Sequence, residues 1–336
     1  MMISKIFESL YLKIFVNIVV YGTKSIVLVE TLNNKGKVES TQEESFDTTG
    51  VDEKMYNFIT SYTNESPFHY ISILDKTPLQ GAIPTCDKEQ MPQDIQLKTL
   101  QYNCYKHRWT YYTSKVELHA LKKEYSKIGL DFVFSPFVVL ARFFQDKIDT
   151  NMAMFVLIEE NYITLSVFDN SELLYSKFID MENDKEIDKL MIEDDGDDSD
   201  NIDLDIGGEM DLDDIEIDEL DNFGDIEDLD SLDDIDEFAD TKDIEEELQE
   251  SDEELNVGDI NSFSEDYQRF LLIQSAINDF YKNRNSTFIE STYIADGIGV
   301  SGDLKRYLEE EMFLNVYIRS IDINLQLSEL AKAELK

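Results

Sequence analysis

The hydrophobic positions of this chain alternate in short runs that predict β-strands, and the strands come in two similar groups. Each group is predicted to be a three-stranded antiparallel meander, with strands at 14–20, 25–30 and 37–46 in the first and at 154–158, 162–168 and 172–179 in the second. Turn-forming residues separate the strands in both groups. The repeated arrangement predicts a fold that is duplicated within one chain, although no residue-level repeat is visible.

Helical periodicity follows each meander. Ser114 with Glu117 forms a capping box whose helix ends before Gly129, and Ser262 with Glu265 forms a second one. Further helices are predicted at 52–62, 135–148 and 301–312, and further strands at 70–74, 131–134, 291–295 and 314–321. This mixture of meanders, helices and single strands indicates an α/β protein with a sizeable core.

A strongly acidic segment interrupts this pattern. Residues 182–259 contain 38 Asp or Glu and three Lys, so they carry −35 of the chain's net charge of −44. Acidic residues alternate there with single Ile, Leu or Phe residues, but a strand would place like charges side by side, which is costly. We therefore expect a disordered insertion. It could be a repulsive linker or a motif that docks on a basic groove; a Ca²⁺ loop at 194–205 lacks the required ligand spacing.

Composition excludes several classes of protein. The sequence contains no run of about 18 apolar residues, so it predicts no membrane span. The apolar start, residues 1–20, lacks a small-residue cleavage site and is expected to be structural. The sequence shows no dense stripe of Lys and Arg, so nucleic-acid binding is disfavoured. Cys86 and Cys104 are the only cysteines, and we expect them to be buried free thiols in a reducing, cytoplasmic compartment.

Isolated motifs give weak support for catalysis or metal binding. Gly297, Gly299 and Gly302 match a dinucleotide fingerprint with Asp322 twenty residues later, but further β-α-β units would be needed. A turn that joins a strand to a helix explains these glycines. The possible metal ligands Cys86, Cys104 and His107 lack a fourth member. Neither a Gly-x-Ser-x-Gly elbow nor a Walker A loop is present in the sequence.

Four stretches, in this order, resemble the PilM group of actin-like proteins, which is related to FtsA and to the cytoplasmic domain of GspL. Residues 21–30 resemble the first phosphate hairpin, 114–142 the passage between the two halves, 164–176 the second phosphate hairpin, and 295–308 the adenosine loop with its helix. The resemblance implies an actin-like (ASKHA or RNase H-like) α/β fold with two lobes.

The resemblance also implies a domain arrangement. The first lobe would span 1–150 and include a peptide-binding subdomain at about 47–130. The second lobe would combine 151–181 with 260–336, and the acidic insertion at 182–259 would stand between its two parts.

The chain departs from the family where ATP and its metal would bind. The carboxylates expected near the two phosphate hairpins are replaced by Val20 and Ile158, and Glu160 stands where a glycine would let phosphate approach. We therefore expect no cofactor, and only a vestigial ATP/Mg site. This degenerate nucleotide pocket would comprise Gly22, Thr23, Lys24, Thr164, Gly297 and Gly299.

The resemblance implies a non-catalytic scaffold of an envelope-spanning machine, such as a type IV pilus, a type II secretion system or a flagellar motor. It would lie in the cytoplasm against the inner membrane, bind the cytoplasmic tail of a single-span, PilN-type protein, and could assemble into a ring or cage. The expected partner-binding residues are aromatic: Tyr102, Tyr105, Trp109, Tyr111 and Tyr112. The alternatives are an active, filament-forming ATPase and an acidic chaperone or decoy. A basic protein is the expected partner of the acidic segment.

Overall fold

The computed structural model describes residues 11–92, 97–181, 257–282 and 288–335. The expected insertion at 182–259 therefore lies outside the described residues, except for its last three, which begin helix α7 (Val257–Lys282). This helix begins five residues before Ser262, so the prediction of a helix start at the capping box of Ser262 and Glu265 is wrong.

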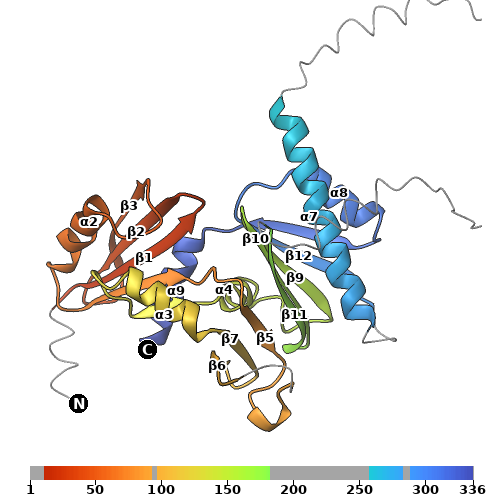
Figure 1. The fold of residues 1–336 in the computed structure, drawn as a ribbon, viewed down its shortest axis with the longest axis horizontal. Coiled ribbons are helices and arrows are strands. Elements are labelled where there is room, and N and C mark those ends of the chain that lie inside the picture. The colour runs from red at the N-terminus through yellow and green to blue at the C-terminus, as the bar shows by residue number, and fades with distance from the viewer. Residues whose placement is uncertain (1–10, 93–96, 182–256, 283–287, 336) are drawn as a thin grey trace, which may run out of the picture. The chain divides into compact units, whose positions relative to one another are not determined.

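The first sheet contains the N-terminal meander and extends it with two parallel strands (Figure 1). Its spatial order is β3 (Val38–Phe46), β2 (Lys24–Leu32), β1 (Lys13–Tyr21), β4 (His69–Leu74) and β8 (Phe132–Phe134). The side chains of β1 alternate between the two faces of the sheet, and both of these faces are buried. Val16 joins the core beneath α2 (Glu53–Thr63), and Phe15 joins the core that includes α9 (Ile323–Glu334).

The second sheet repeats this topology. Its order is β11 (Glu172–Asp180), β10 (Tyr162–Asp169), β9 (Ala153–Ile158), β12 (Ser291–Asp296) and β13 (Asn315–Ser320). In both sheets the meander is antiparallel and the two added strands are parallel to its first strand. The shared order, with the first strand at the centre, confirms the expected duplicated actin-like fold.

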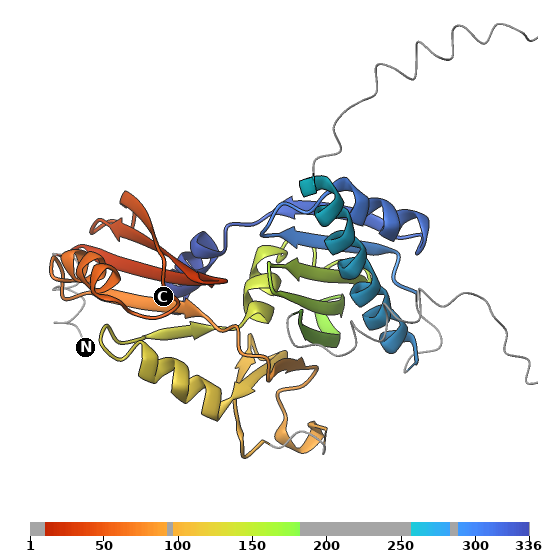
Figure 2. The same ribbon diagram turned by 45° about the horizontal axis from the view of Figure 1, so that its top comes forward.

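Helices cover both faces of the second sheet. Val156 packs in one core with α7 and with α8 (Gly302–Glu310), whereas Phe155 packs on the other side with α4 (Pro136–Phe143). Figure 2 shows α7 crossing the strands. Helix α4 is shorter than the predicted 135–148, because the chain turns after Phe144 at its C-cap.

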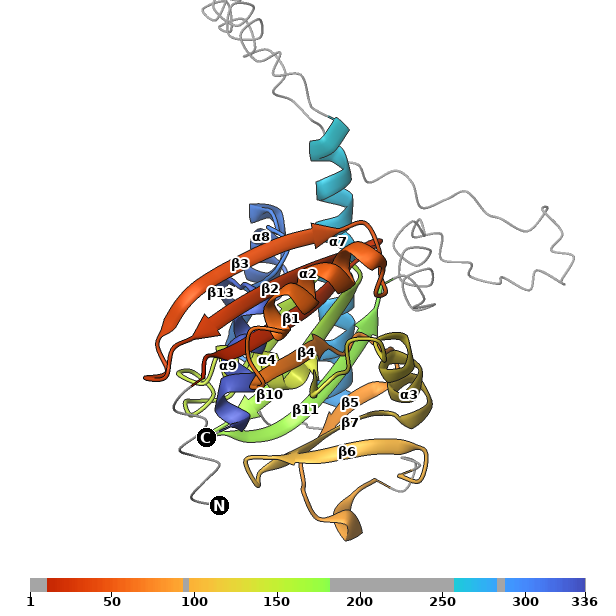
Figure 3. The same cartoon turned by 90° about the vertical axis from the view of Figure 1, so that its left-hand side faces the viewer.

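A third, smaller sheet lies in the sequence between β4 and β8. Its order is β5 (Gln80–Ile83), β7 (Trp109–Ser114) and β6 (Leu100–Tyr105), and a short 3₁₀ turn, Lys88–Gln90, lies in the loop before β6. Helix α3 (Lys115–Glu124) follows β7 directly (Figure 3). Ser114 accepts the Glu117 N–H, so the predicted N-cap of this helix is confirmed. The Ser114 N–H donates to the Leu79 carbonyl and not to Glu117, so the reciprocal half of the predicted capping box is wrong.

Two sequence-based expectations are corrected in this region and at the C-terminal helix. Cys86 and Cys104 form a disulfide, so the prediction of free thiols is wrong; it rested on cysteine number, whereas pairing depends on the fold bringing the two residues together. Asp322 is the N-cap of α9, where it accepts the Leu325 N–H. A capping role therefore accounts for the carboxylate that the dinucleotide motif singled out. None of the helices within the described residues is long and apolar enough to cross a membrane.

Candidate functional site

The β1–β2 turn, in the stretch that resembles the first phosphate hairpin, contacts the β9–β10 turn, which has the equivalent place in the second sheet. The stretch 164–176, expected to be the second phosphate hairpin, runs instead from β10 into β11. Gly22 is in the β1–β2 turn with φ +51°, and a Cβ built on it would stand 3.6 Å from Glu160 Oε2 in the β9–β10 turn. The left-handed backbone explains why a glycine occupies this turn. The group that it faces is a carboxylate of the same chain, which would repel a phosphate.

Glu159 is fully buried next to this contact. A Cβ on Gly297 would stand only 1.9 Å from Glu159 Oε1, so the carboxylate occupies the space that this glycine leaves open. Neither carboxylate oxygen has a hydrogen-bond partner among the described residues. Burial, helped by Asp296 and Glu160, raises the pKa of Glu159 to about 7, although Lys76 opposes the shift.

Lys76 brings a positive charge to the same place. It follows β4, and its Nζ donates to the Val20 carbonyl and lies 4.5 Å from the ring centre of Tyr21 and 5.4 Å from that of Tyr162. Burial lowers the pKa of Lys76, while the charges of Glu159 and Glu160 act in the opposite direction. This lysine therefore links the β1–β2 hairpin with the β9–β10 turn through electrostatics and ring contacts.

The glycine-rich loop after β12 is closed by its own carboxylate. Asp296 Oδ1 accepts the backbone N–H groups of Ile298 at 3.1 Å, Gly299 at 2.7 Å and Val300 at 3.1 Å. Such a row of N–H groups is the kind of concavity that can hold an anion. Here a side chain of the protein already satisfies the donors.

These residues do not fit a bound Mg-triphosphate. A triphosphate needs free backbone donors and close approach to glycines, and a divalent metal needs carboxylates free to coordinate it or its waters. At the two hairpins, Glu160 faces Gly22 and Glu159 fills the space beside Gly297. The described part of the chain contains no group of three or more His, Cys, Asp or Glu residues placed to hold a metal ion.

The other expected pocket residues do not converge with these glycines. Thr23 is exposed, and Lys24 Nζ is directed to Asp47 at 3.8 Å, beside the end of β3. Thr164 is buried within β10, and its hydroxyl has no hydrogen-bond partner among the described residues. Gly22, Gly297 and Gly299 thus lie in the loops around Glu159 and Glu160. Thr23 and Lys24 belong to the same β1–β2 hairpin as Gly22, but the Thr23 side chain is exposed and Lys24 is directed to Asp47, and Thr164 is buried in β10.

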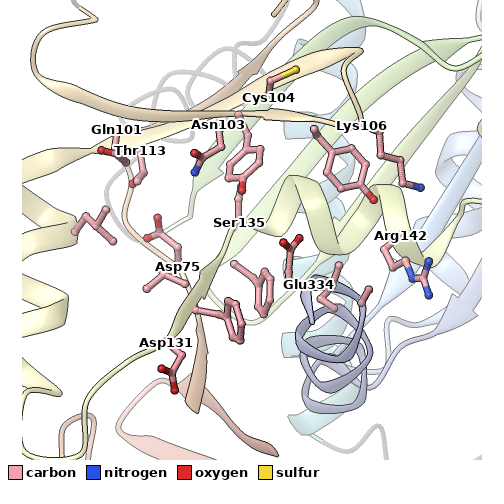
Figure 4. A pocket seen from close by; sticks show the side chains of 18 of the residues that line it. Asp75, Gln101, Asn103, Cys104, Lys106, Thr113, Asp131, Ser135, Arg142 and Glu334 are labelled. Carbon is pink, nitrogen blue, oxygen red and sulfur yellow. The ribbon is translucent and has the colours of Figure 1, made fainter. Parts of the chain in front are cut away.

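A separate groove of about 690 Å³ lies between the small sheet and the first large sheet (Figure 4). One wall carries Asn103, Tyr105 and Tyr111 from β6 and β7, and the opposite wall is the stretch 131–135, which includes β8. Because β8 is the last strand in its sheet, one of its edges has no neighbouring strand among the described residues. Glu334, near the end of α9, also lines the groove.

The groove divides the five aromatic residues expected to bind a partner. Tyr105 and Tyr111 line it, and both are partly exposed. Tyr102 and Tyr112 pair across β6 and β7 and point to the other face of the small sheet. Trp109 is only 3% exposed and packs edge-on against Phe168 at 6.1 Å, so it belongs to the core.

Several residues of the two regions were not singled out from the sequence. Lys76 and Glu159 come from different sheets, and no local signal connects them. The groove depends on β6 and β8, which are separated by about 30 residues, together with the C-terminal end of α9. One local signal could have pointed to Asp75 and Lys76: they lie at the carboxyl end of β4, and the carboxyl ends of parallel strands are where ligand sites usually form.

Two models of known protein families match the chain. A family model described as "Domain of unknown function (DUF8341)" matches residues 154–336, which is more than half of the sequence. The chain belongs to this family. The DUF8341 match takes in the second sheet and α9, while a second model, "Domain of unknown function (DUF8569)", matches residues 11–141 and takes in the first sheet and the small sheet. No curated protein matches.

Several solved structures are similar to this DUF8341 member. A Bacteroides thetaiotaomicron protein with an actin-like ATPase fold is 12% identical, with 94% of this chain and 95% of that chain covered and a TM-score of 0.45. The PilM–PilN type IV pilus biogenesis complex is 9% identical, with coverages of 92% and 88% and a TM-score of 0.45. The ethanolamine utilization protein EutJ from Carboxydothermus hydrogenoformans is 8% identical, with coverages of 91% and 84% and a TM-score of 0.39. At these identities the likeness concerns the fold alone.

Proposed function

We propose that this chain is a non-catalytic scaffold that holds an extended segment of a partner protein in the groove beside β8. The observation that carries the proposal is the groove itself, which joins an unpaired strand edge to a wall with two partly exposed tyrosines. The closed hairpin region supports the non-catalytic part, because carboxylates of Glu159 and Glu160 stand where phosphate would approach.

The shape and chemistry of the groove suit a peptide. A free strand edge can extend its sheet by main-chain hydrogen bonds with an added strand, while pockets select alternate side chains. Tyr105 and Tyr111 would provide those side-chain contacts, because tyrosine buries a large area at small entropic cost and keeps a polar end. The pKa values of both phenols are raised, mainly by burial, so both remain neutral hydrogen-bond donors.

The resemblance to the PilM group suggests the partner. We propose the cytoplasmic tail of a single-span, PilN-type inner-membrane protein, which would hold the chain at the cytoplasmic face of an envelope machine. A pilus, a secretion system and a flagellar motor are the settings that this implies, with a ring or cage of copies as the assembly. A basic protein is proposed as an additional partner of the acidic segment.

One observation favours the ATPase alternative. Gly22 and Gly299 keep positive φ values of +51° and +85° in the loops that resemble nucleotide-binding loops. Against it stands the occupation of both loops by carboxylates of the chain itself. The acidic-chaperone alternative would not require the two patterned sheets with their separate cores.

Site-specific photocrosslinking in the cell of origin tests the scaffold. A benzoylphenylalanine at Asn103, within the groove, should crosslink to the cytoplasmic tail of one single-span membrane protein, whereas the same probe at the exposed Asn57 on α2 should not. Ala333→Trp would fill the groove from α9 and abolish the crosslink, while Ala120→Trp, on the exposed side of α3, would leave it. Equal crosslinking from both positions, or products only with soluble basic proteins, would contradict the proposal.

A further inference from the structure

The groove beside β8 carries charges of opposite sign toward its two ends. Asp75 and Asp131 lie toward one end, whereas Lys106 and Arg142 lie toward the other (Figure 4). Elsewhere in the fold such charges are paired, as Lys332 is with Glu30 at 2.8 Å. None of the four groove side chains forms an ion pair with a described residue, so their charges are available to a ligand.

The acidic end is built where β4 and β8 meet. Asp131 Oδ2 accepts the Ile71 N–H at 2.8 Å, and the side chain is otherwise exposed. Asp75 is only 2% exposed, and its Oδ1 accepts both the N–H and the hydroxyl of Thr77. The Thr77 hydroxyl is in turn 2.9 Å from that of Thr113 on the opposite wall. These contacts hold both carboxylates in place.

The basic end is formed by Tyr105 and the cations around it. Lys106 follows Tyr105 in the chain, and its Nζ lies 5.2 Å from the centre of the Tyr105 ring. Arg142 Nη1 donates to Gln145 Oε1 at 2.9 Å, and the other guanidinium donors make no hydrogen bond with a described residue. Burial raises the pKa of Tyr105, Arg142 opposes this increase and Glu334 adds to it, which places both charges near the phenol.

Two further charged side chains line the groove and reduce this contrast. Lys122 lies on α3, which leads through a short loop to Asp131, and Glu334 lies at the end of α9. Both are exposed, whereas Asp75 is buried and Arg142 is partly buried. Charges that are removed from water act more strongly on a ligand than exposed ones do. Asp75 and Arg142 therefore determine the sign at the two ends.

A strand edge runs between the charged ends. The Asp131 N–H donates to the Ile71 carbonyl at 2.9 Å, so the next residue, Phe132, directs its main-chain N–H and C=O away from β4 and toward the groove. On the other wall, Asn103 and Tyr111 lie opposite each other on β6 and β7. A segment bound between these walls would be extended, with every second side chain on the same face.

We propose that the groove selects a bipolar segment, which is an extended stretch with a basic side chain near one end and an acidic side chain near the other. The basic side chain meets Asp75 and Asp131, and the acidic one meets Lys106 and Arg142. Charge complementarity favours this occupant, because a segment of one sign would place like charges together at one end, which is costly. The inference rests on the proposed function, since it requires an extended segment in the groove, and it adds which segments the groove accepts.

Fluorescently labelled peptides with blocked ends test the selection. Both consist of alternating Val and Thr; one carries a Lys and a Glu on the same face, four or six positions apart, and the other carries Gln at these two positions. Neither peptide has a net charge, so the net charge of −44 on the full chain favours neither. Fluorescence anisotropy should show that the bipolar peptide binds the full chain about tenfold more tightly, as expected for two partly buried charge contacts.

Neutralising variants locate the effect. Asp131→Asn and Arg142→Gln together remove one charge from each end and keep a hydrogen-bonding side chain at both positions. The bipolar peptide should then bind only as tightly as the neutral one, and the unchanged affinity of the neutral peptide would show that the groove is intact. Glu39→Gln with Lys54→Gln, at two exposed positions outside the groove, is the matched control and should change neither affinity.

The outcomes separate this inference from the proposed function. Equal affinities of the two peptides, both abolished by Ala333→Trp, would overturn the charge selection and leave the groove as a peptide site. A preference for the bipolar peptide that survives Asp131→Asn with Arg142→Gln would also overturn it. If neither peptide binds, or if Ala333→Trp leaves binding unchanged, the groove is not a peptide site and both proposals fail.

Discussion

Glu159 and Gly297 fit together so closely that there is no room for a side chain at position 297. The Glu159 Oε1 atom lies 1.9 Å from where a Cβ of Gly297 would be, and the Ile158 carbonyl lies 3.1 Å from the same point. The glycine of the loop after β12 therefore makes room for a side chain of this protein. In a nucleotide-binding loop the same freedom would admit a phosphate.

Gly297→Ala should destabilise the protein by about 1–3 kcal/mol, because the added methyl group overlaps the buried carboxylate. Glu159→Ala in the same chain should recover part of this loss, since it removes the atoms that the methyl group meets. Urea unfolding of the single and double variants measures the coupling. Gly302→Ala is the control, because a Cβ there meets nothing within 4 Å. Strictly additive effects of Gly297→Ala and Glu159→Ala would show that the two residues do not meet.

Glu159→Gln should stabilise the protein at alkaline pH. The folded-state pKa of about 7 exceeds the ordinary value of 4.5, so the folded chain binds more protons than the unfolded chain between these values. The free energy of unfolding therefore falls as pH rises from about 4.5 to 7. A neutral glutamine removes this loss, and the variant should gain about 2–3 kcal/mol over the wild type between pH 5 and pH 8.

Urea unfolding at several pH values measures this difference. If Glu159→Gln follows the wild-type pH profile, the buried carboxylate does not titrate near neutrality and the account of its surroundings is wrong.

Trp109→Ala should lower the free energy of unfolding by about 3–5 kcal/mol, as expected for a buried aromatic side chain. Trp109 joins the small sheet to Phe168 of β10, whereas Tyr102 is partly exposed and lies 5.3 Å from Lys88 Nζ. Tyr102→Ala should therefore cost about 1 kcal/mol or less. Chemical unfolding followed by circular dichroism compares the two, and similar losses would place Trp109 outside the core.

Reduction of the Cys86–Cys104 disulfide should lower stability by up to about 3 kcal/mol, because the bond restricts a loop of the unfolded chain. The single tryptophan, Trp109, lies on the adjacent strand β7 and reports unfolding by its fluorescence. Dithiothreitol should shift the urea midpoint of the wild type and leave Cys86→Ser/Cys104→Ser unaffected. A wild-type midpoint that ignores the reductant would mean that the bond is absent in solution.

The local parts of the fold could be predicted from the sequence. Alternating β-branched residues indicated both meanders, and Ser114 and Ser135 marked helix starts, because these signals act within a few residues. Gly129 did not mark the end of α3, which ends at Glu124 with Tyr125 as its C-cap. The actin-like fold with two similar halves followed from the resemblance to actin-like proteins and from the two meanders. The small sheet was harder, since β5 has four residues and pairs with β7, about 30 positions later.

The candidate sites depend on contacts that no local pattern records. Lys76 and Glu159 are separated by more than 80 residues and come together only when two turns from different sheets meet. Strand alternation divides the aromatic cluster between the two faces of the small sheet. It could not tell that Trp109 would face Phe168 while Tyr111 lined a groove.

Isothermal titration with Mg-ATP tests most directly the central claim, that the chain's own carboxylates close its nucleotide site. Glu159, Glu160 and Asp296 occupy the space and the donors that a triphosphate would need. The account predicts no saturable heat at millimolar Mg-ATP for the wild type and for Gly22→Trp alike. Micromolar binding by the wild type that Gly22→Trp abolishes would contradict it.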